Sequence, residues 1–139
     1  MRKIFTILFS VMLVLSSCDR AFENGELDGM WRLERVVSDD SELLPQNVYY
    51  SFQRHIVMLG RYYEEQMPHL YMAKFACEGS LLEMSMFKEY PGVEDICDSE
   101  VLESFCIYNP EGVVFVIERL NDEVLIMQSD SRKYFFRKW

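Results

Sequence analysis

The sequence predicts an all-β domain, an antiparallel barrel of about eight strands that closes fully or in part. Short runs rich in Val, Ile, Tyr and Phe recur from residue 29 onward, and turn residues separate them. The alternation of strands and long helices that builds a parallel sheet is missing. Many antiparallel strands in one small domain leave exposed edges unless the sheet closes on itself.

The first predicted strand covers residues 30–37 and alternates between two kinds of side chain. Trp31, Leu33 and Val37 form its apolar face, and charged side chains lie between them. This pattern is typical of a strand with one buried face.

The middle of the chain predicts three further strands. A polar loop over 38–45 leads to a long strand over 47–59, and the charged, tyrosine-bearing residues 60–68 form the next loop. Two alternating runs follow at 70–77 and 80–87. The two-residue turn between them predicts a β-hairpin.

The segment 88–104 departs from the strand pattern. It contains the turn signal Tyr90-Pro91-Gly92, is acidic, and carries apolar residues at roughly helical spacing. We expect a short helical or irregular insertion there, followed by a short strand over 105–108.

The C-terminal part carries the clearest pattern. Three predicted strands over 113–120, 123–128 and 132–139 are joined by the very short turns Asn121-Asp122 and Ser129-Asp130. Strands connected in this way form an antiparallel meander.

The N-terminus resembles the export signal of a bacterial lipoprotein. Basic residues precede an apolar run over 4–15, which is shorter than the roughly 20 residues of a membrane-spanning helix. The run leads into Leu15-Ser16-Ser17-Cys18, which resembles a lipobox. The resemblance implies cleavage before Cys18 and acyl chains on that residue. An ordinary cleaved signal is the alternative.

We therefore expect a signal peptide over 1–17, a lipidated tether over 18–28 and a single barrel domain over 29–139. The acyl chains on Cys18 would hold the protein at the membrane. The expected location is the cell envelope, as an outer-membrane lipoprotein that faces the periplasm or the cell surface.

The charge of the chain excludes one class of partner. The sequence has 23 acidic and 14 basic residues and a formal net charge of −9. A surface of this sign repels nucleic acid and anionic lipid. We expect no nucleic-acid partner.

A short motif at the start of the first strand points to a family. Gly29-Met30-Trp31 resembles the Gly-x-Trp signature of the lipocalin superfamily. The chain is also similar to small lipocalin-like lipoproteins of Bacteroides-type bacteria in its lipobox, its Tyr49-Tyr50-Ser51-Phe52 strand and its aromatic, basic C-terminus. The resemblance implies a lipocalin-like barrel in which Trp31 plugs one end and Arg137 packs on its indole.

The interior of an eight-stranded barrel is either filled by side chains or holds one small ligand. Aromatic and methionine residues on the predicted strands would line it, namely Tyr50, Phe52, Phe75, Met84, Met86, Phe115 and Phe135. Methionine adapts to irregular apolar shapes, which suits a pocket. The same side chains would equally form a packed core, and both interpretations stay open.

The sequence has no recognisable catalytic or metal-binding pattern. His55 and His69 do not stand at the spacing of a zinc site, and neither a Gly-x-Ser-x-Gly elbow nor a phosphate-binding glycine loop occurs. We therefore expect no enzyme activity, no metal and no cofactor.

Three cysteines remain after Cys18. Cys77, Cys97 and Cys106 allow one disulfide and one free thiol, or three buried thiols. A bridge between Cys97 and Cys106 is the preferred pairing, although spacing alone cannot choose one.

Two functions fit these observations. The first is a lipid-anchored envelope protein that binds a small apolar ligand inside the barrel. The second is a non-enzymatic interaction or structural lipoprotein whose filled barrel acts in an envelope protein assembly. An enclosed apolar cavity would favour the first, and a filled lumen would favour the second.

Overall fold

The computed structural model describes residues 24–92 and 99–139 of the chain. Its helices and strands are, in chain order, η2 (Gly25–Leu27), β1 (Gly29–Val37), β2 (Glu42–Leu43), β3 (Val48–Gln53), β4 (Ile56–Arg61), β5 (Leu70–Glu78), β6 (Leu81–Tyr90), α2 (Ser99–Glu103), β7 (Gly112–Leu120), β8 (Val124–Ser129) and β9 (Arg132–Lys138).

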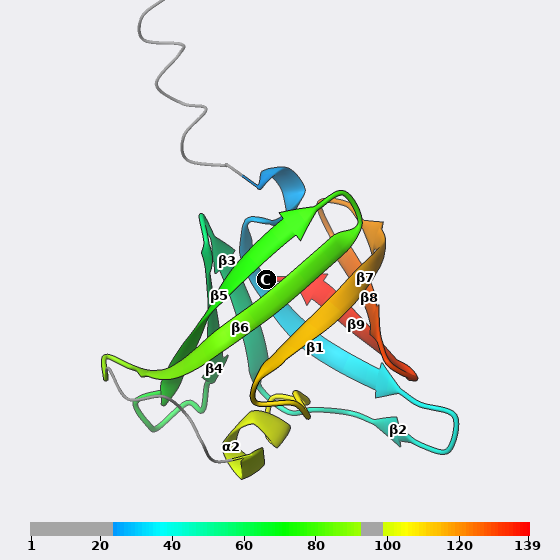
Figure 1. Ribbon diagram of the computed structural model, residues 1–139. Coiled ribbons are helices and arrows are strands. Elements are labelled where there is room, and N and C mark those ends of the chain that lie inside the picture. The colour runs from blue at the N-terminus through cyan, green and yellow to red at the C-terminus, as the bar shows by residue number, and fades with distance from the viewer. Residues whose placement is uncertain (1–23, 93–98) are drawn as a thin grey trace, which may run out of the picture.

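The strands form one antiparallel sheet that curves into a ring (Figure 1). The order is β2-β1-β3-β4-β5-β6-β7-β8-β9, and an additional pairing of β1 with β9 joins the two ends of the main sheet. The short β2 pairs only with the end of β1, at Val36–Leu43 and Val37–Glu42. The predicted all-β antiparallel fold is confirmed.

Alternating side chains from all the ring strands meet in a single apolar core. They include Trp31 and Leu33 from β1, Tyr50 and Phe52 from β3, Leu59, Phe75, Met84, Phe115, Leu125, Met127, Tyr134 and Phe136. Fully burying one such side chain contributes about 1.5–3 kcal/mol. The core is therefore the main source of stability, as period-two burial in a strand requires.

The sheet has three register shifts, in β1, β6 and β7, and those in β1 and β6 change which of the predicted residues face the core. In β1 an extra residue lies between the pairs Leu33–Phe136 and Arg35–Phe135, so Val36 is buried instead of the predicted Val37. In β6 the register shifts opposite β5 in the same way. A sequence pattern that assumes strict alternation misses both shifts.

Two predicted strands differ from the structure. The long strand over 47–59 is a hairpin, because the chain reverses at Arg54, which has a φ of +56°, and Gln53 pairs with Ile56. Residues 105–108 do not form a strand. The predicted insertion is present in part, since α2 lies within it, while β6 continues to Tyr90 and residues 93–98 are outside the described part of the chain.

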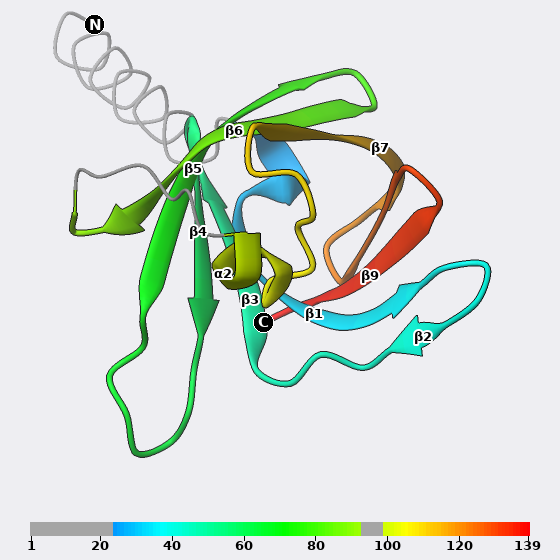
Figure 2. The ribbon, with the colours of Figure 1, turned by 60° about the horizontal axis from the view of Figure 1, so that its bottom comes forward.

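The two ends of the ring are covered by different segments. The N-terminal turn η2 lies at one end and α2 at the other (Figure 1). Figure 2 shows α2 and the chain after it lying across their end of the ring. The predicted signal peptide and Cys18 fall outside the described residues.

Candidate functional site

The lumen of the ring is filled with side chains. Tyr50, Phe52, Phe75, Met84 and Phe115 lie in the core, as expected for lumen residues, and each is at most 5 % exposed. Phe52 and Phe75 meet edge to face with 5.1 Å between ring centroids. A void large enough for water would leave part of these surfaces accessible, so the near-complete burial indicates a packed interior within the described part of the chain.

The predicted lumen positions of Met86 and Phe135 are wrong. Met86 is 50 % exposed with a φ of +58°, because the bulge in β6 turns it outward and buries Phe87 in its place. Phe135 lies on the outer face of β9, where the Arg35 guanidinium is 4.1 Å from its ring centroid. Its neighbours Tyr134 and Phe136 are buried instead.

The segment 102–107, which we call the plug, fills the end of the ring where α2 lies. Leu102, Phe105 and Ile107 are almost fully buried in the core cluster. The last turn of α2 positions them, since the amides of Phe105 and Ile107 both donate to the Leu102 carbonyl at 3.0 Å.

Two tyrosines on the ring hold the backbone of the plug. The Tyr50 hydroxyl donates to the Phe105 carbonyl at 2.5 Å, and the Tyr134 hydroxyl donates to the Cys106 carbonyl at 2.7 Å. Burial raises the pKa of Tyr50 well above its usual range, and burial likewise raises the pKa of Tyr134. Both hydroxyls therefore stay protonated as donors.

Trp31 is fully buried at the opposite end of the ring, beneath η2. Its indole N–H donates to the Leu27 carbonyl at 2.8 Å. The Lys138 ammonium lies 4.5 Å from the indole centroid and donates to the carbonyls of Glu26 and Asp28. The cation next to the indole thus comes from β9.

The prediction that Arg137 packs on the Trp31 indole is wrong. Arg137 lies on the outer face, and its side chain is 59 % exposed. Alternation along β9 explains the difference, because Phe136 and Lys138 share the inward phase while Phe135 and Arg137 share the outward one. The same alternation is legible in the sequence and is the signal that identifies Lys138.

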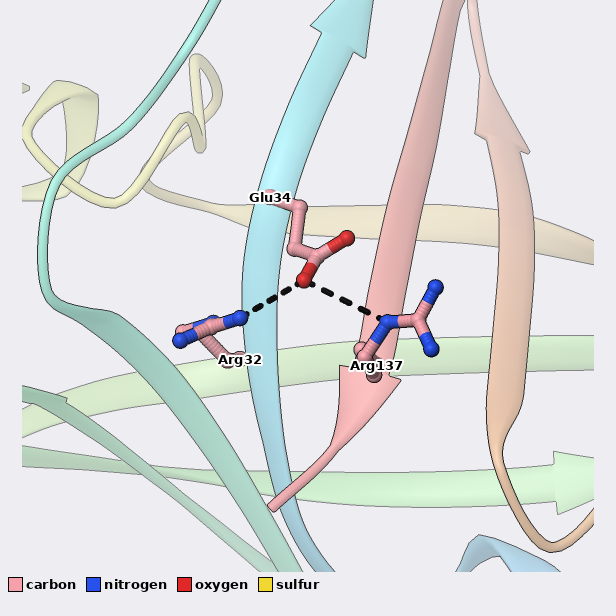
Figure 3. Close-up of polar contacts among 3 residues, drawn as sticks. All are labelled: Arg32, Glu34 and Arg137. Atoms are coloured by element: carbon pink, nitrogen blue, oxygen red, sulfur yellow. Dashed lines mark hydrogen bonds and ion pairs between the residues drawn. The ribbon is translucent and has the colours of Figure 1, made fainter.

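Arg137 instead belongs to a small ionic cluster on the outer face (Figure 3). Glu34 Oε1 lies 2.8 Å from an Arg32 nitrogen and 3.5 Å from Arg137 Nε. The hydrogen bond from Arg32 is the main reason that the pKa of Glu34 is lowered, and Arg137 adds to it. The cluster is solvent-exposed, so its contribution to stability is small.

A hollow of about 190 Å³ lies on the outer side of the plug. The end of β4, the loop from β4 to β5 and α2 with the residues after it line this space. Arg61 and His69 contribute its basic side chains, and Tyr71, Val101 and Phe105 contribute apolar walls. We call it the mouth hollow. His69, to which the sequence assigns no role, is therefore part of a concave surface.

Within residues 24–92 and 99–139, the remaining candidate groups do not form a reactive centre. Cys77 and Cys106 are free thiols, while Cys97, the preferred partner of Cys106, lies outside the described residues. Burial raises the pKa of the Cys106 thiol, so it is a poor nucleophile.

Among residues 24–92 and 99–139, histidine, cysteine and acidic side chains form no group that could hold a metal ion. No helix in these ranges is long and apolar enough to cross a membrane.

Sequence reasoning missed the plug. The sequence places Leu102 in the short helical or irregular insertion and Phe105 and Ile107 in a short strand, whereas all three supply part of the core. Their apolar character is visible in the run Phe105-Cys106-Ile107. Their position in the core cannot be predicted from the local sequence, because it depends on the space left between strands that are distant in the chain.

Comparisons with known proteins agree with this geometry. A family model described as a lipocalin-like domain matches residues 13–139. No curated protein matched the sequence significantly.

Two crystal structures share the fold. One is a lipocalin-like protein from Bacteroides uniformis, with a TM-score of 0.68 and 20 % identity over 83 % of this chain and 100 % of that one. The other is an uncharacterized protein from Bacteroides eggerthii, with a TM-score of 0.68 and 15 % identity over 81 % of this chain and 99 % of that one. With the family match over nearly its whole length, the chain belongs to the lipocalin-like domain family.

Proposed function

We propose that this protein is a lipid-anchored, non-enzymatic protein of the cell envelope whose filled ring acts through its outer surface within a protein assembly. The observation that carries the proposal is the packed lumen. Core aromatics occupy it, and the plug and the Trp31 end close it from both sides. A carrier of an apolar ligand needs an enclosed cavity, typically about 300–1,000 Å³.

The outer surface carries residue types that are enriched in protein interfaces. Trp139 is 70 % exposed, and the Arg32 guanidinium lies 5.7 Å from its ring centroid. The ring of Tyr49 meets that of Trp139 edge to face at 5.5 Å, which orients the indole. A rigid exposed aromatic beside an arginine favours a protein partner at this face.

The family resemblance also supports ligand binding as a second candidate. Lipocalin-like domains form a fold that can hold small molecules. A ligand inside this lumen would have to displace the plug and break the hydrogen bonds from Tyr50 and Tyr134. The filled interior therefore favours surface interaction over transport.

Native mass spectrometry of the protein purified from its own host separates the two candidates. We expect a co-purifying protein in defined stoichiometry, and its reduction by Trp139→Ala but not by Met86→Ala. Absence of any co-purifying protein, together with a reproducible one-to-one small molecule too large for the hollow of about 190 Å³ outside the plug, would overturn the proposal and favour the carrier.

The lipid anchor needs its own test. The lipobox-like Leu15-Ser16-Ser17-Cys18 supports acylation at Cys18. In a bacterial host that processes lipoproteins, we expect labelled palmitate to enter the wild-type chain and the membrane fraction to retain it. Cys18→Ala should abolish both, whereas Cys77→Ala should change neither. Label that persists in Cys18→Ala would refute the anchor.

A further inference from the structure

The mouth hollow contains a basic group without its usual partner. Arg61 Nε is buried and has no hydrogen-bond partner among the described residues. A buried donor without an acceptor is costly, so a bound water or ligand oxygen close to Arg61 would relieve that cost. The Arg61 guanidinium lies over the ring of Tyr63, 5.9 Å from its centroid, and both residues line the hollow.

The charge around this hollow differs from that of the chain as a whole. The described lining contains the basic side chains Arg61 and His69, and no carboxylate. The acidic residues of the same loop, Glu64 and Glu65, line a separate, more open depression next to it. In a chain with a net charge of −9, the described lining of this hollow therefore presents a guanidinium without a neighbouring carboxylate.

The rest of the hollow is apolar. Tyr71 and Phe105 meet edge to face with 5.6 Å between ring centroids, and Val101 of α2 continues the wall. Met67 at the rim is 92 % exposed and free to adjust to a bound molecule. Phe105 is held in place at the hollow, because its carbonyl accepts a hydrogen bond from the Tyr50 hydroxyl.

We propose that the mouth hollow binds a small carboxylate with a short apolar body. The carboxylate accepts hydrogen bonds from Arg61 and from a ring nitrogen of His69, and the apolar body contacts Tyr71, Val101 and Phe105. A volume of about 190 Å³ restricts the ligand to short molecules. The site lies outside the filled lumen, so it requires neither the lipid anchor nor release of the plug.

The test uses the full-length chain carrying Cys18→Ala, so that no acyl chain competes for the site. Isothermal titration calorimetry compares hexanoate with hexanol, hexylammonium and acetate. We expect hexanoate to bind at least tenfold more tightly than hexanol or acetate, and hexylammonium to bind more weakly still. Amide chemical shifts should move in the β4–β5 loop and α2, since both line the hollow.

Single substitutions test whether Arg61 and His69 bind the carboxylate of hexanoate. Arg61→Gln and His69→Gln should each weaken hexanoate at least tenfold while leaving hexanol unchanged. Arg54→Gln, on the β3–β4 turn, serves as the matched control and should bind like the parent. If Arg61→Gln fails to fold, the exposed His69→Gln and the alcohol comparison still decide the question.

Three outcomes would overturn the proposal. They are no binding of hexanoate, equal affinity for hexanoate and hexanol, and wild-type affinity in both variants. None of these would affect the proposed surface function, which is tested by co-purification of a protein partner. Loss of the partner with retained hexanoate binding would conversely refute only the surface function.

Discussion

Tyr50 and Tyr134 illustrate how single residues connect the ring to its plug. Each contributes its ring to the lumen and its hydroxyl to a backbone carbonyl of the plug. The phenol ring supplies apolar burial and the hydroxyl satisfies an acceptor that water cannot reach. Phenylalanine would supply only the first of these.

Removing either hydroxyl should therefore destabilise the fold without changing its shape. We expect Tyr50→Phe and Tyr134→Phe each to lower the free energy of unfolding by about 1–3 kcal/mol, because a buried carbonyl loses its donor. Urea denaturation followed by circular dichroism measures the change. Tyr90→Phe, at an exposed tyrosine, is the control and should stay within about 0.5 kcal/mol of wild type.

The same tyrosines predict a loss of stability in alkali. Burial raises the pKa of Tyr50 and Tyr134 in the folded state, whereas in the unfolded chain tyrosine ionises near its ordinary pKa of about 10. Above that pH the unfolded state binds fewer protons than the folded state, so the free energy of unfolding falls as the pH rises. Below it, both states are protonated and the contribution is constant.

Urea midpoints between about pH 9 and 11.5 measure this dependence. The double variant Tyr50→Phe, Tyr134→Phe should lose stability less steeply than wild type above about pH 10. Burial also raises the pKa of Cys106, but this thiol is present in both proteins and its effect cancels in the comparison. Identical slopes would show that the two phenols ionise as they do in the unfolded chain.

Lys138 and Arg137 form a matched pair of neighbouring cations with opposite orientation. Lys138→Met should lower the free energy of unfolding by about 1–2 kcal/mol, because it removes the cation beside Trp31 and two hydrogen bonds to backbone carbonyls. Arg137→Met removes an exposed ion pair and should cost at most about 0.5 kcal/mol. Thermal denaturation compares the two, and a larger loss for Arg137→Met would contradict the orientation of β9.

At the scale of elements, the bulge in β6 decides which methionine is buried. Register pairs join Met72 with Lys88 and Lys74 with Ser85, so one residue of β5 faces two of β6 between these pairs. The extra residue turns Met86 outward after Met84 has pointed inward. A bulge of this kind re-aims every side chain that follows it.

Alanine substitutions two residues apart test this register. Met84→Ala should lower the free energy of unfolding by about 2–5 kcal/mol, because it leaves a cavity in a fully packed core. Met86→Ala should change it by no more than about 0.5 kcal/mol, since the side chain is half exposed. Chemical denaturation gives both values. Similar losses at the two positions would place both side chains in the core and exclude the bulge.

At the scale of the whole molecule, the two ends of the chain complete the ring. β1 pairs with β9 from Trp31–Lys138 to Val37–Lys133, and β8 lies on the other side of β9. Without β9 the facing edges of β1 and β8 would be unpaired, and Tyr134 and Phe136 would be lost from the core. Unpaired edges of this length promote association with other chains.

Deleting residues 132–139 should therefore abolish cooperative thermal unfolding and cause aggregation, as judged by circular dichroism and light scattering. Deleting Trp139 alone is the control. This exposed residue lies beyond the register of β9, so the shortened chain should keep a cooperative transition. A cooperative, monomeric protein after the longer deletion would mean that the ring is not needed for folding.

Local alternation in the sequence determined much of the fold. The C-terminal meander, the β5–β6 hairpin and the inward positions of Trp31, Tyr50, Phe52 and Met84 follow from period two and short turns. Alternation along the last strand likewise predicts that Lys138 points inward. These features depend only on neighbours in the chain, and a strand points alternate side chains to opposite sides whatever surrounds it.

Tertiary contacts decided the rest. The bulges at β1 and β6 arise because a partner strand offers one residue where the bulged strand offers two. The reversal at Arg54 and the entry of Phe105 and Ile107 into the lumen depend on the volume that distant strands leave free. Whether such a ring is hollow or filled is a property of that total volume, which no stretch of sequence contains by itself.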